Sequence, residues 1–293
     1  MKLKKLTIIA LSALAGAAAG CTDFVEPGKD NVLTREDVIA NPVLAEGILL
    51  KAYDNLPTTL NYTEVAVDDA HSNNISNGYM LAAMGAWRST SDPFSQWRNY
   101  TQIAYINYFL DQIVDDVKWS YTSEWRAEHF PNRLKGEAYA LRAYHHSLIL
   151  QAHAGRSSSG ELLGVPYMDR FISSKQEQDG LQRLPFAECV GKIEKDIERA
   201  LQLLPDRYEN APAGTPDKED YDVVYGSRNT NRISGLAMKM LRAKLLELKI
   251  QQHAEKISDL KGVQLKIEWG SQIRSYVFMP YQLVKDTRTD YET

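Results

Sequence analysis

The segment RLKGEAYALRAYHHSLILQAHAG, residues 133–155, gives the clearest indication of the fold class of this chain. Its apolar and small side chains recur at alternating spacings of four and three residues, the period of one face of an α-helix. These positions are Leu134, Ala138, Leu141, His145, Leu148 and Ala152. Gly155 is the expected stop signal. The pattern predicts a long helix whose small alanines let another helix approach closely.

The segment LPFAECVGKIEKDIERALQLLP, residues 184–205, predicts a second amphipathic helix between Pro185 and Pro205. Its apolar stripe consists of Phe186, Cys189, Ile193, Ile197, Ala200, Leu201 and Leu204. Three further stretches, 34–56, 97–117 and 233–260, show helical spacing, and Thr34 is a suitable N-cap. Strand-like alternation is scarce before residue 220, and residues 57–95 are expected to be long loops. We therefore predict a mainly α-helical body.

The chain begins with the three parts of a bacterial secretory signal. Lys2, Lys4 and Lys5 precede an apolar run, which ends in small residues up to Gly20. Ala18-Ala19-Gly20-Cys21 resembles a lipobox, although Ala18 stands where Leu is usual. We expect residues 1–20 to be removed and Cys21 to be lipidated, which would hold the protein to a membrane. Residues 22–34 are polar and suit a spacer.

Composition and motif content argue against several classes of function. If Cys21 is acylated, Cys189 is the only other cysteine, so no internal disulfide forms and the core alone must stabilise the fold. A formal net charge of −4 argues against nucleic-acid binding. The sequence contains no metal-ligand spacing, nucleophile elbow, P-loop or Cys-x-x-Cys motif. We expect no catalytic residues, no metal and no cofactor.

Several motifs together are similar to SusD/RagB-type outer-membrane lipoproteins of Bacteroidota. They are GCTDFVEP at 20–27, WRNYTQIAYINYFLDQI at 97–113, KGEAYALRAYHHSLILQAHAG at 135–155 with GVPYM at 164–168, the segment 184–205, and NRISGLAMKMLRAK at 231–244. They occur in family order and cover about 21–245. The resemblance implies paired tetratricopeptide-like helices with long loops. It also implies a surface lipoprotein that captures oligosaccharides or other nutrients and works with a SusC-like TonB-dependent transporter.

The end of the chain resembles a different family. Residues 237–293, which include WGSQIRSYV and VKDTRTDYET, are similar to the C-terminal part of bacterial class I peptide chain release factors that read UGA. Asp290 stands where that family has Gly, and no Gly-Gly-Gln tripeptide occurs. We therefore expect three parts: a signal peptide (1–20), an incomplete SusD-like domain (21–236) and a release-factor-like helix/strand tail (237–293).

Alternatives to this chimeric lipoprotein remain. The tail can be a genuine segment of a SusD-like protein, or the chain can be a fragment without activity. A peptide chain release factor is a further alternative, but it conflicts with an export signal. An exported glycoside-active enzyme would need two carboxylates at a set separation across a cleft. The Asp68-Asp69 and Asp115-Asp116 pairs are more typical of solvated loops and helix ends.

Candidate ligand-binding residues lie in 68–98, where flat aromatic rings alternate with polar side chains. Aromatic rings match the apolar faces of sugars, and amides, carboxylates and guanidinium groups bind hydroxyls. Trp87 and Tyr79 are the stacking candidates; Asn73, Asn74, Asp69 and Arg88 are the polar candidates. The sequence fits Trp87 equally well to the apolar core and to the binding site. Trp97 is assigned to the core, Trp119 and Trp125 to packing, and His145 and His146 to hydrogen-bonded interior positions.

Overall fold

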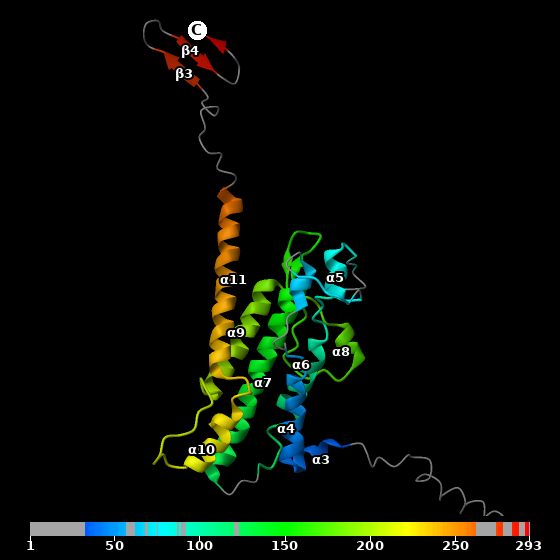
Figure 1. Cartoon of the computed structure of the whole chain (residues 1–293), viewed down its shortest axis with the longest axis vertical. Helices are drawn as coiled ribbons and strands as arrows, with labels where there is room; N and C mark the ends of the chain where they lie inside the picture. The colour runs from blue at the N-terminus through cyan, green and yellow to red at the C-terminus, as the bar shows by residue number, and fades with distance from the viewer. Residues whose placement is uncertain are drawn as a thin grey trace, which may run out of the picture. The chain divides into compact units, whose positions relative to one another are not determined.

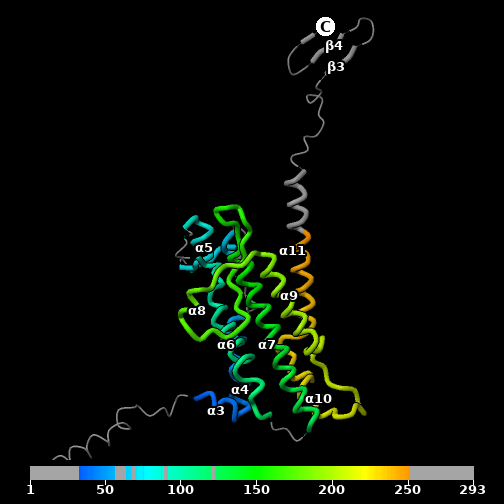
Figure 2. The backbone as a smooth tube through the Cα atoms, turned by 180° about the vertical axis from the view of Figure 1, so that it is seen from behind, coloured from blue at the N-terminus to red at the C-terminus, as the bar shows by residue number. Residues whose placement is uncertain are grey.

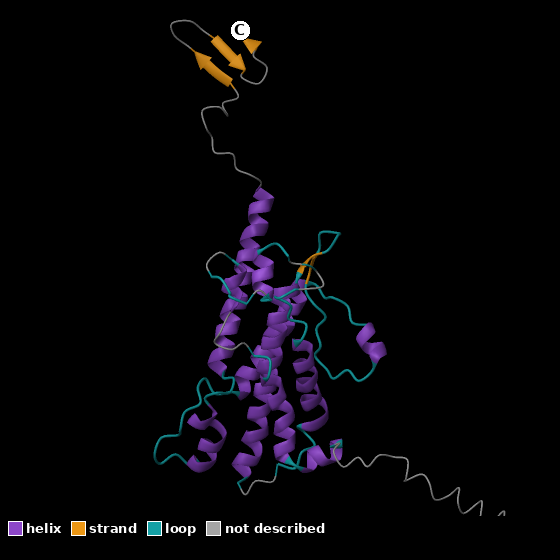
Figure 3. Ribbon diagram, turned by 45° about the vertical axis from the view of Figure 1, so that its right-hand side comes forward, coloured by secondary structure: helices purple, strands orange, loops and turns teal. Residues whose placement is uncertain are grey.

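A computed structural model describes residues 33–56, 62–67, 70–74, 76–86, 88, 92–119, 123–261, 274–277, 283–286 and 291–292. The chain divides into two compact units, Met1–Lys239 and Met240–Thr293. Helices dominate the described residues, as predicted, and the strands are few and short (Figure 3). None of the helices among the described residues combines the length and apolar character needed to cross a bilayer.

The first unit is built from helices in chain order. They are α3 (Arg35–Ala40), α4 (Pro42–Leu50), α5 (Gly78–Ala83), α6 (Asn99–Tyr108), α7 (Glu124–His153), α8 (Lys175–Asp179), α9 (Phe186–Leu203) and α10 (Lys218–Tyr225). Short 3-10 turns occur at η1 (Lys51–Tyr53), η2 (Tyr62–Ala66) and η4 (Ser227–Asn229), and a π-helical turn, η3 (Phe109–Ile113), continues α6. One antiparallel pair, β1 (Gly155–Arg156) and β2 (Leu162–Leu163), follows α7.

The predicted helix over 133–155 is the C-terminal part of α7, which lies between α6 and α9 (Figure 1). Ala138, Ala140 and Ala143 are completely buried, so neighbouring helices approach closely at these positions, as predicted. Viewed from behind, α10 lies beside the N-terminal end of α7 (Figure 2). The main apolar core forms where these helices meet α4. Its buried members are Val38, Ala45, Leu49, Ala52, Ile106, Phe109, Ile113, Val114, Val117, Phe130, Leu134, Ala138, Leu141 and Val224.

Local capping explains how the chain enters this bundle. Thr34 and Asp37 form a reciprocal capping box at the start of α3, which confirms Thr34 as an N-cap. Asn41 then ends α3 and caps α4, whose first residue is Pro42. The stretch 34–56 therefore forms two helices and a 3-10 turn rather than one continuous helix. Residues 57–95, expected to be loops, contain η2 and α5 between irregular segments.

Helix α11 (Gly235–Lys261) begins in the first unit and continues into the second. The second unit also contains β3 (Arg274–Val277), β4 (Leu283–Asp286) and β5 (Tyr291–Glu292). These strands form an antiparallel sheet in the order β3-β4-β5, with Arg274 opposite Asp286 and Asp286 opposite Tyr291. This unit contains the helix and strands predicted for the end of the chain.

Candidate functional site

The predicted binding residues do not form one described cluster. Tyr79 lies on α5, and its ring meets Phe94 edge-on with centroids 5.2 Å apart. Asn73, Asn74 and Arg88 are exposed. Among the described residues, no hydrogen bond or ring contact joins these three side chains to Tyr79.

Some of the predicted site residues are not among the residues that the structure describes. Trp87 and Asp69 lie outside the described residues, as does Cys21. Of the exposed amides, Asn74 accepts the Ser76 N–H at 3.0 Å through Oδ1, which makes a local turn. The assignment of ligand-binding roles in 68–98 therefore stays a prediction.

Trp97 is 47% exposed, so its assignment to the core is wrong. It precedes the first turn of α6, and its indole stacks on the imidazole of His153 at the end of α7, with centroids 3.7 Å apart and planes within 10°. The ring of Tyr100 is nearly parallel to the indole at 6.0 Å. His153 covers one face of the indole, while nearly half of the side chain stays in contact with solvent. A flat, partly exposed aromatic platform results.

Hydrogen bonds hold the His153 ring and the end of its helix in place. Its Nε2 accepts the Gln96 N–H at 2.9 Å, so the ring is neutral with its proton on Nδ1. Burial lowers the pKa of His153, and the charge of Arg183 lowers it further while Asp92 raises it. Arg183 also donates to the His153 carbonyl at 3.0 Å and to the Gly164 carbonyl at 2.7 Å. These bonds hold the C-terminal end of α7 against the segment that follows it.

A cavity of about 340 Å³ adjoins this platform at the same helix ends. It is lined by Asp92, Phe94, Gln96, Leu148, Gln151 and Ala152. Asp92 Oδ1 accepts the Phe94 N–H at 2.9 Å, which leaves Oδ2 without a partner among the described residues. The Gln151 side chain is exposed and likewise has no hydrogen-bond partner in the described part of the chain. One carboxylate oxygen and one amide are therefore available to a ligand.

A second cavity, of about 510 Å³, is lined in part by Tyr100 and is mainly apolar. Its lining residues are Tyr100, Thr101, Ala104, Pro166, Met168, Gln178 and Leu181. The Tyr100 hydroxyl donates to the Pro166 carbonyl at 2.6 Å, which fixes the ring at the wall of this cavity. Burial raises the pKa of Tyr100, so its hydroxyl is protonated at neutral pH.

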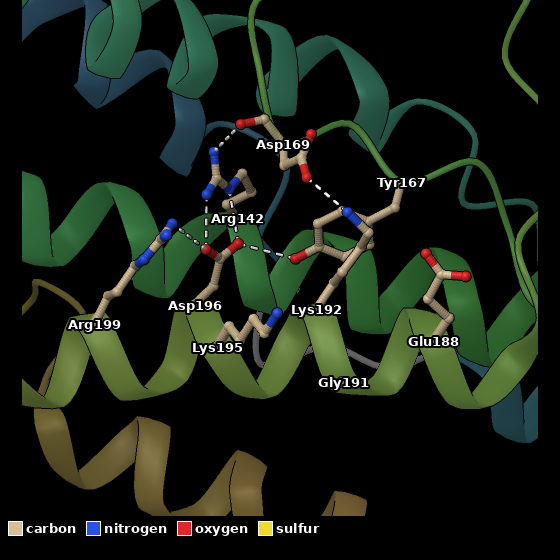
Figure 4. Close-up of a pocket in the computed structure, with 9 residues that line it drawn as sticks. All are labelled: Arg142, Tyr167, Asp169, Glu188, Gly191, Lys192, Lys195, Asp196 and Arg199. Carbon is tan, nitrogen blue, oxygen red and sulfur yellow. Dashed lines mark hydrogen bonds and ion pairs between the residues drawn. The ribbon is translucent and has the colours of Figure 1, made fainter.

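A third cavity, of about 420 Å³, lies between α7 and α9 and is strongly charged (Figure 4). At its floor, Arg142 of α7 binds both carboxylate oxygens of Asp196 of α9 at 2.7 Å. The Tyr167 hydroxyl donates to Asp196 at 2.9 Å, and Arg142 also reaches Asn107 at 2.8 Å. Burial alone would lower the pKa of Arg142, but the hydrogen bonds and charge of Asp196 raise it overall. This ion pair is therefore saturated by its own partners.

The predictions for His145, His146, Trp119 and Trp125 are confirmed. His145 and His146 are completely buried on α7, and each ring has two hydrogen-bond contacts within the protein. Trp119 packs against the core and donates to the Val114 carbonyl at 3.0 Å. Trp125 also packs against the core and stacks on His129 with centroids 4.0 Å apart.

The Asp115-Asp116 pair lies in solvent-exposed ion pairs. Asp115 pairs with Lys135 at 2.5 Å, and Asp116 pairs with Arg35, so the two acids face separate cations near the end of η3. Their interpretation as solvated side chains is confirmed, because their side chains are 74% and 57% exposed. Asp68 and Asp69 lie outside the described residues. Within the described ranges, no group of His, Cys, Asp and Glu is arranged to hold a metal ion.

Solved structures with the same fold are longer than this chain. A SusD-like protein from Bacteroides fragilis NCTC 9343 superposes with a TM-score of 0.53 and 18% identity, over 75% of this chain and 37% of its own. A laminarin-binding SusD-like protein superposes with a TM-score of 0.51 and 18% identity, over 70% of this chain and 40% of its own. At 18% sequence identity, these similarities show a shared fold and nothing more.

Curated relatives match a shorter part of the chain. Peptide chain release factor 2 of Staphylococcus aureus (strain bovine RF122 / ET3-1) is 56% identical over 57 residues, which are 20% of this chain and 15% of the factor. The Rickettsia bellii factor is 42% identical over 87 residues, 30% of this chain and 22% of the factor. The chain thus spans less than a quarter of either release factor.

The family that covers most of the chain is the SusD-like family described as "Starch-binding associating with outer membrane", which matches residues 23–220. This range contains the helical bundle, the Trp97 platform and the charged cavity. Together with the helical fold, the match shows that the chain belongs to the SusD-like family of carbohydrate-binding proteins.

Proposed function

We propose that this protein binds neutral glucan oligosaccharides at the Trp97 platform. The observation that carries the proposal is the half-exposed indole of Trp97, held flat by His153 beside a cavity with free polar groups. Sugar rings present apolar C–H faces that stack on aromatic rings, while their hydroxyls need oriented donors and acceptors. Asp92 Oδ2 and the Gln151 amide supply such groups next to the ring. The starch-binding description of the family and the laminarin-binding relative support a glucan.

The cellular role proposed with this activity is nutrient capture without catalysis. Residues 1–20 direct export, and Cys21 carries lipid that holds the protein to the outer membrane, facing the cell surface. From there it passes ligand to a SusC-like TonB-dependent transporter. The family's association with the outer membrane supports this placement. We infer in addition that residues 21–236 form an incomplete SusD-like domain and that residues 237–293 were joined to it from a release factor.

Replacing Trp97 tests the binding site directly. Trp97→Ala should weaken binding of maltoheptaose or laminarin oligosaccharides by about tenfold or more, because roughly 1.4 kcal/mol of stacking corresponds to that factor. Isothermal titration calorimetry on the full chain measures this change. The platform is exposed, so the melting temperature should change little.

Tyr105→Ala is the matched control, because Tyr105 lies on α6, which follows Trp97, and is 40% exposed but lines none of the three cavities. It should leave the affinity unchanged. Equal affinity of Trp97→Ala and wild type would rule out this platform. Release of reducing ends during incubation with the polysaccharides would instead favour an enzyme.

A further inference from the structure

The charged cleft between α7 and α9 contains cations that its own residues do not neutralise. Along one face of α9, it presents Glu188, Lys192, Lys195 and Arg199 around the buried Asp196 (Figure 4). Lys192 is paired with Asp169 at 2.7 Å. Lys195 has no hydrogen-bond or ion-pair partner among the described residues, and no dashed line reaches it in Figure 4.

Arg199 makes only one long ion-pair contact within the cleft. Its nearest carboxylate is Asp196 at 3.7 Å, but Arg142 and Tyr167 already occupy both oxygens of that carboxylate. The Arg199 guanidinium lies 5.2 Å from the centre of the Tyr139 ring, and the side chain is 55% exposed. Its N–H groups are therefore available at the edge of the cavity.

The two ends of the cleft carry opposite charges. Glu188 lies at the other end of this face, and within the described residues it has no ion-pair partner. Arg199 lies eleven positions after Glu188, and a helix rises by about 1.5 Å per residue, so the two ends are about 16 Å apart along the axis. One end therefore favours an anion, and the other repels anions and accepts hydrogen bonds from hydroxyls. The span suits an elongated ligand with an acidic group at one end.

We propose that this cleft binds an acidic saccharide, with a uronate carboxylate held by Arg199 and Lys195. A planar guanidinium matches a carboxylate in a bidentate arrangement, and the neighbouring ammonium adds a second charge-assisted hydrogen bond. Glu188 accepts hydroxyl groups at the far end of the cleft. The anionic part of this inference rests on the cleft alone, and the saccharide part rests on the proposed carbohydrate-binding function.

The test uses the full chain and two ligands that differ in charge, trigalacturonate and its methyl-esterified form. Wild type should bind the acid about tenfold more tightly than the ester, and added salt should reduce the difference. Lys195→Gln/Arg199→Gln should remove the preference. The control Lys175→Gln/Arg207→Gln removes the same charge from two exposed residues that do not line the cleft, and it should keep the preference.

The inference would be overturned by equal binding of acid and ester, by equal loss of the preference in both double variants, or by displacement of trigalacturonate by the same concentration of inorganic sulfate. Maltoheptaose binding distinguishes this site from the Trp97 platform. The cleft variant should keep maltoheptaose binding, and Trp97→Ala should keep trigalacturonate binding. If trigalacturonate fails to bind while maltoheptaose binds, the cleft proposal alone is wrong.

Discussion

At His146, backbone groups use both ring nitrogens. Nδ1 donates to the Arg142 carbonyl at 3.0 Å, and Nε2 accepts the Met168 N–H at 3.1 Å. A second proton, on Nε2, would face the Met168 N–H, so the neutral ring fits this position. Burial lowers the pKa of His146 to about 3, although the bond to Arg142 opposes this shift. The ring also stacks on Tyr167 with centroids 3.8 Å apart, next to the charged cleft.

His146 should make the fold sensitive to acid. An unfolded histidine titrates near 6.5, whereas the pKa of folded His146 is about 3, so the unfolded state binds more protons between these values. Its contribution to the free energy of unfolding is complete above pH 6.5 and falls by roughly 1.4 kcal/mol per pH unit below it. Urea unfolding of wild type and His146→Asn at pH 7.5 and pH 5.0 measures this. The variant should be less stable at pH 7.5 but lose less on acidification; equal losses would contradict the assignment.

At the scale of elements, the contact between α7 and α9 depends on a glycine. A Cβ at Gly136 would lie 2.9 Å from Leu203 Cβ and 2.9 Å from Leu204 Cγ, closer than real side chains approach. The absence of a side chain on α7 thus lets the end of α9 pack directly on the backbone. Gly47 on α4 differs, because nothing lies within 4 Å of a Cβ built there.

These two glycines should respond in opposite ways to the same change. Gly136→Ala should lower the free energy of unfolding by about 1–3 kcal/mol, because the added methyl group overpacks the contact. Gly47→Ala should raise it by about 0.5–1 kcal/mol, because alanine favours a helix without meeting a neighbour. Chemical denaturation followed by circular dichroism measures both. A stable Gly136→Ala variant would mean that α7 and α9 are not in such close contact.

At the scale of the whole molecule, the SusD-like match covers only part of the chain. The SusD-like match ends at residue 220, and the described structure changes from one compact unit to another at Lys239–Met240. The proposed export signal in residues 1–20 and the lack of a Gly-Gly-Gln tripeptide in the sequence both argue against the release-factor alternative. We therefore assign the functional proposals to the helical unit and none to the tail.

The proposed lipidation at Cys21 would determine where the whole molecule is found. In a bacterial host that processes lipoproteins, wild type should label with radioactive palmitate and sediment with outer membranes. Cys21→Ser should lose the label and move to the soluble fraction, because the acyl chains supply the membrane affinity. Cys189→Ser is the control and should keep the label. Unlabelled wild type with residues 1–20 still attached would contradict the proposed export and anchoring.

Helical periodicity and motif order are local properties, so the mainly helical class, the helices in 133–155 and 184–205 and the two family resemblances could be predicted from the amino-acid sequence. The interior positions of His145 and His146 were predicted in the same way. The exposure of Trp97 on His153, and the network of Arg142, Tyr167 and Asp196, became visible only in the folded protein. Periodicity identifies the buried face of a helix but not its partner. Contacts between residues 97 and 153, or 142 and 196, depend on how whole helices pack against each other.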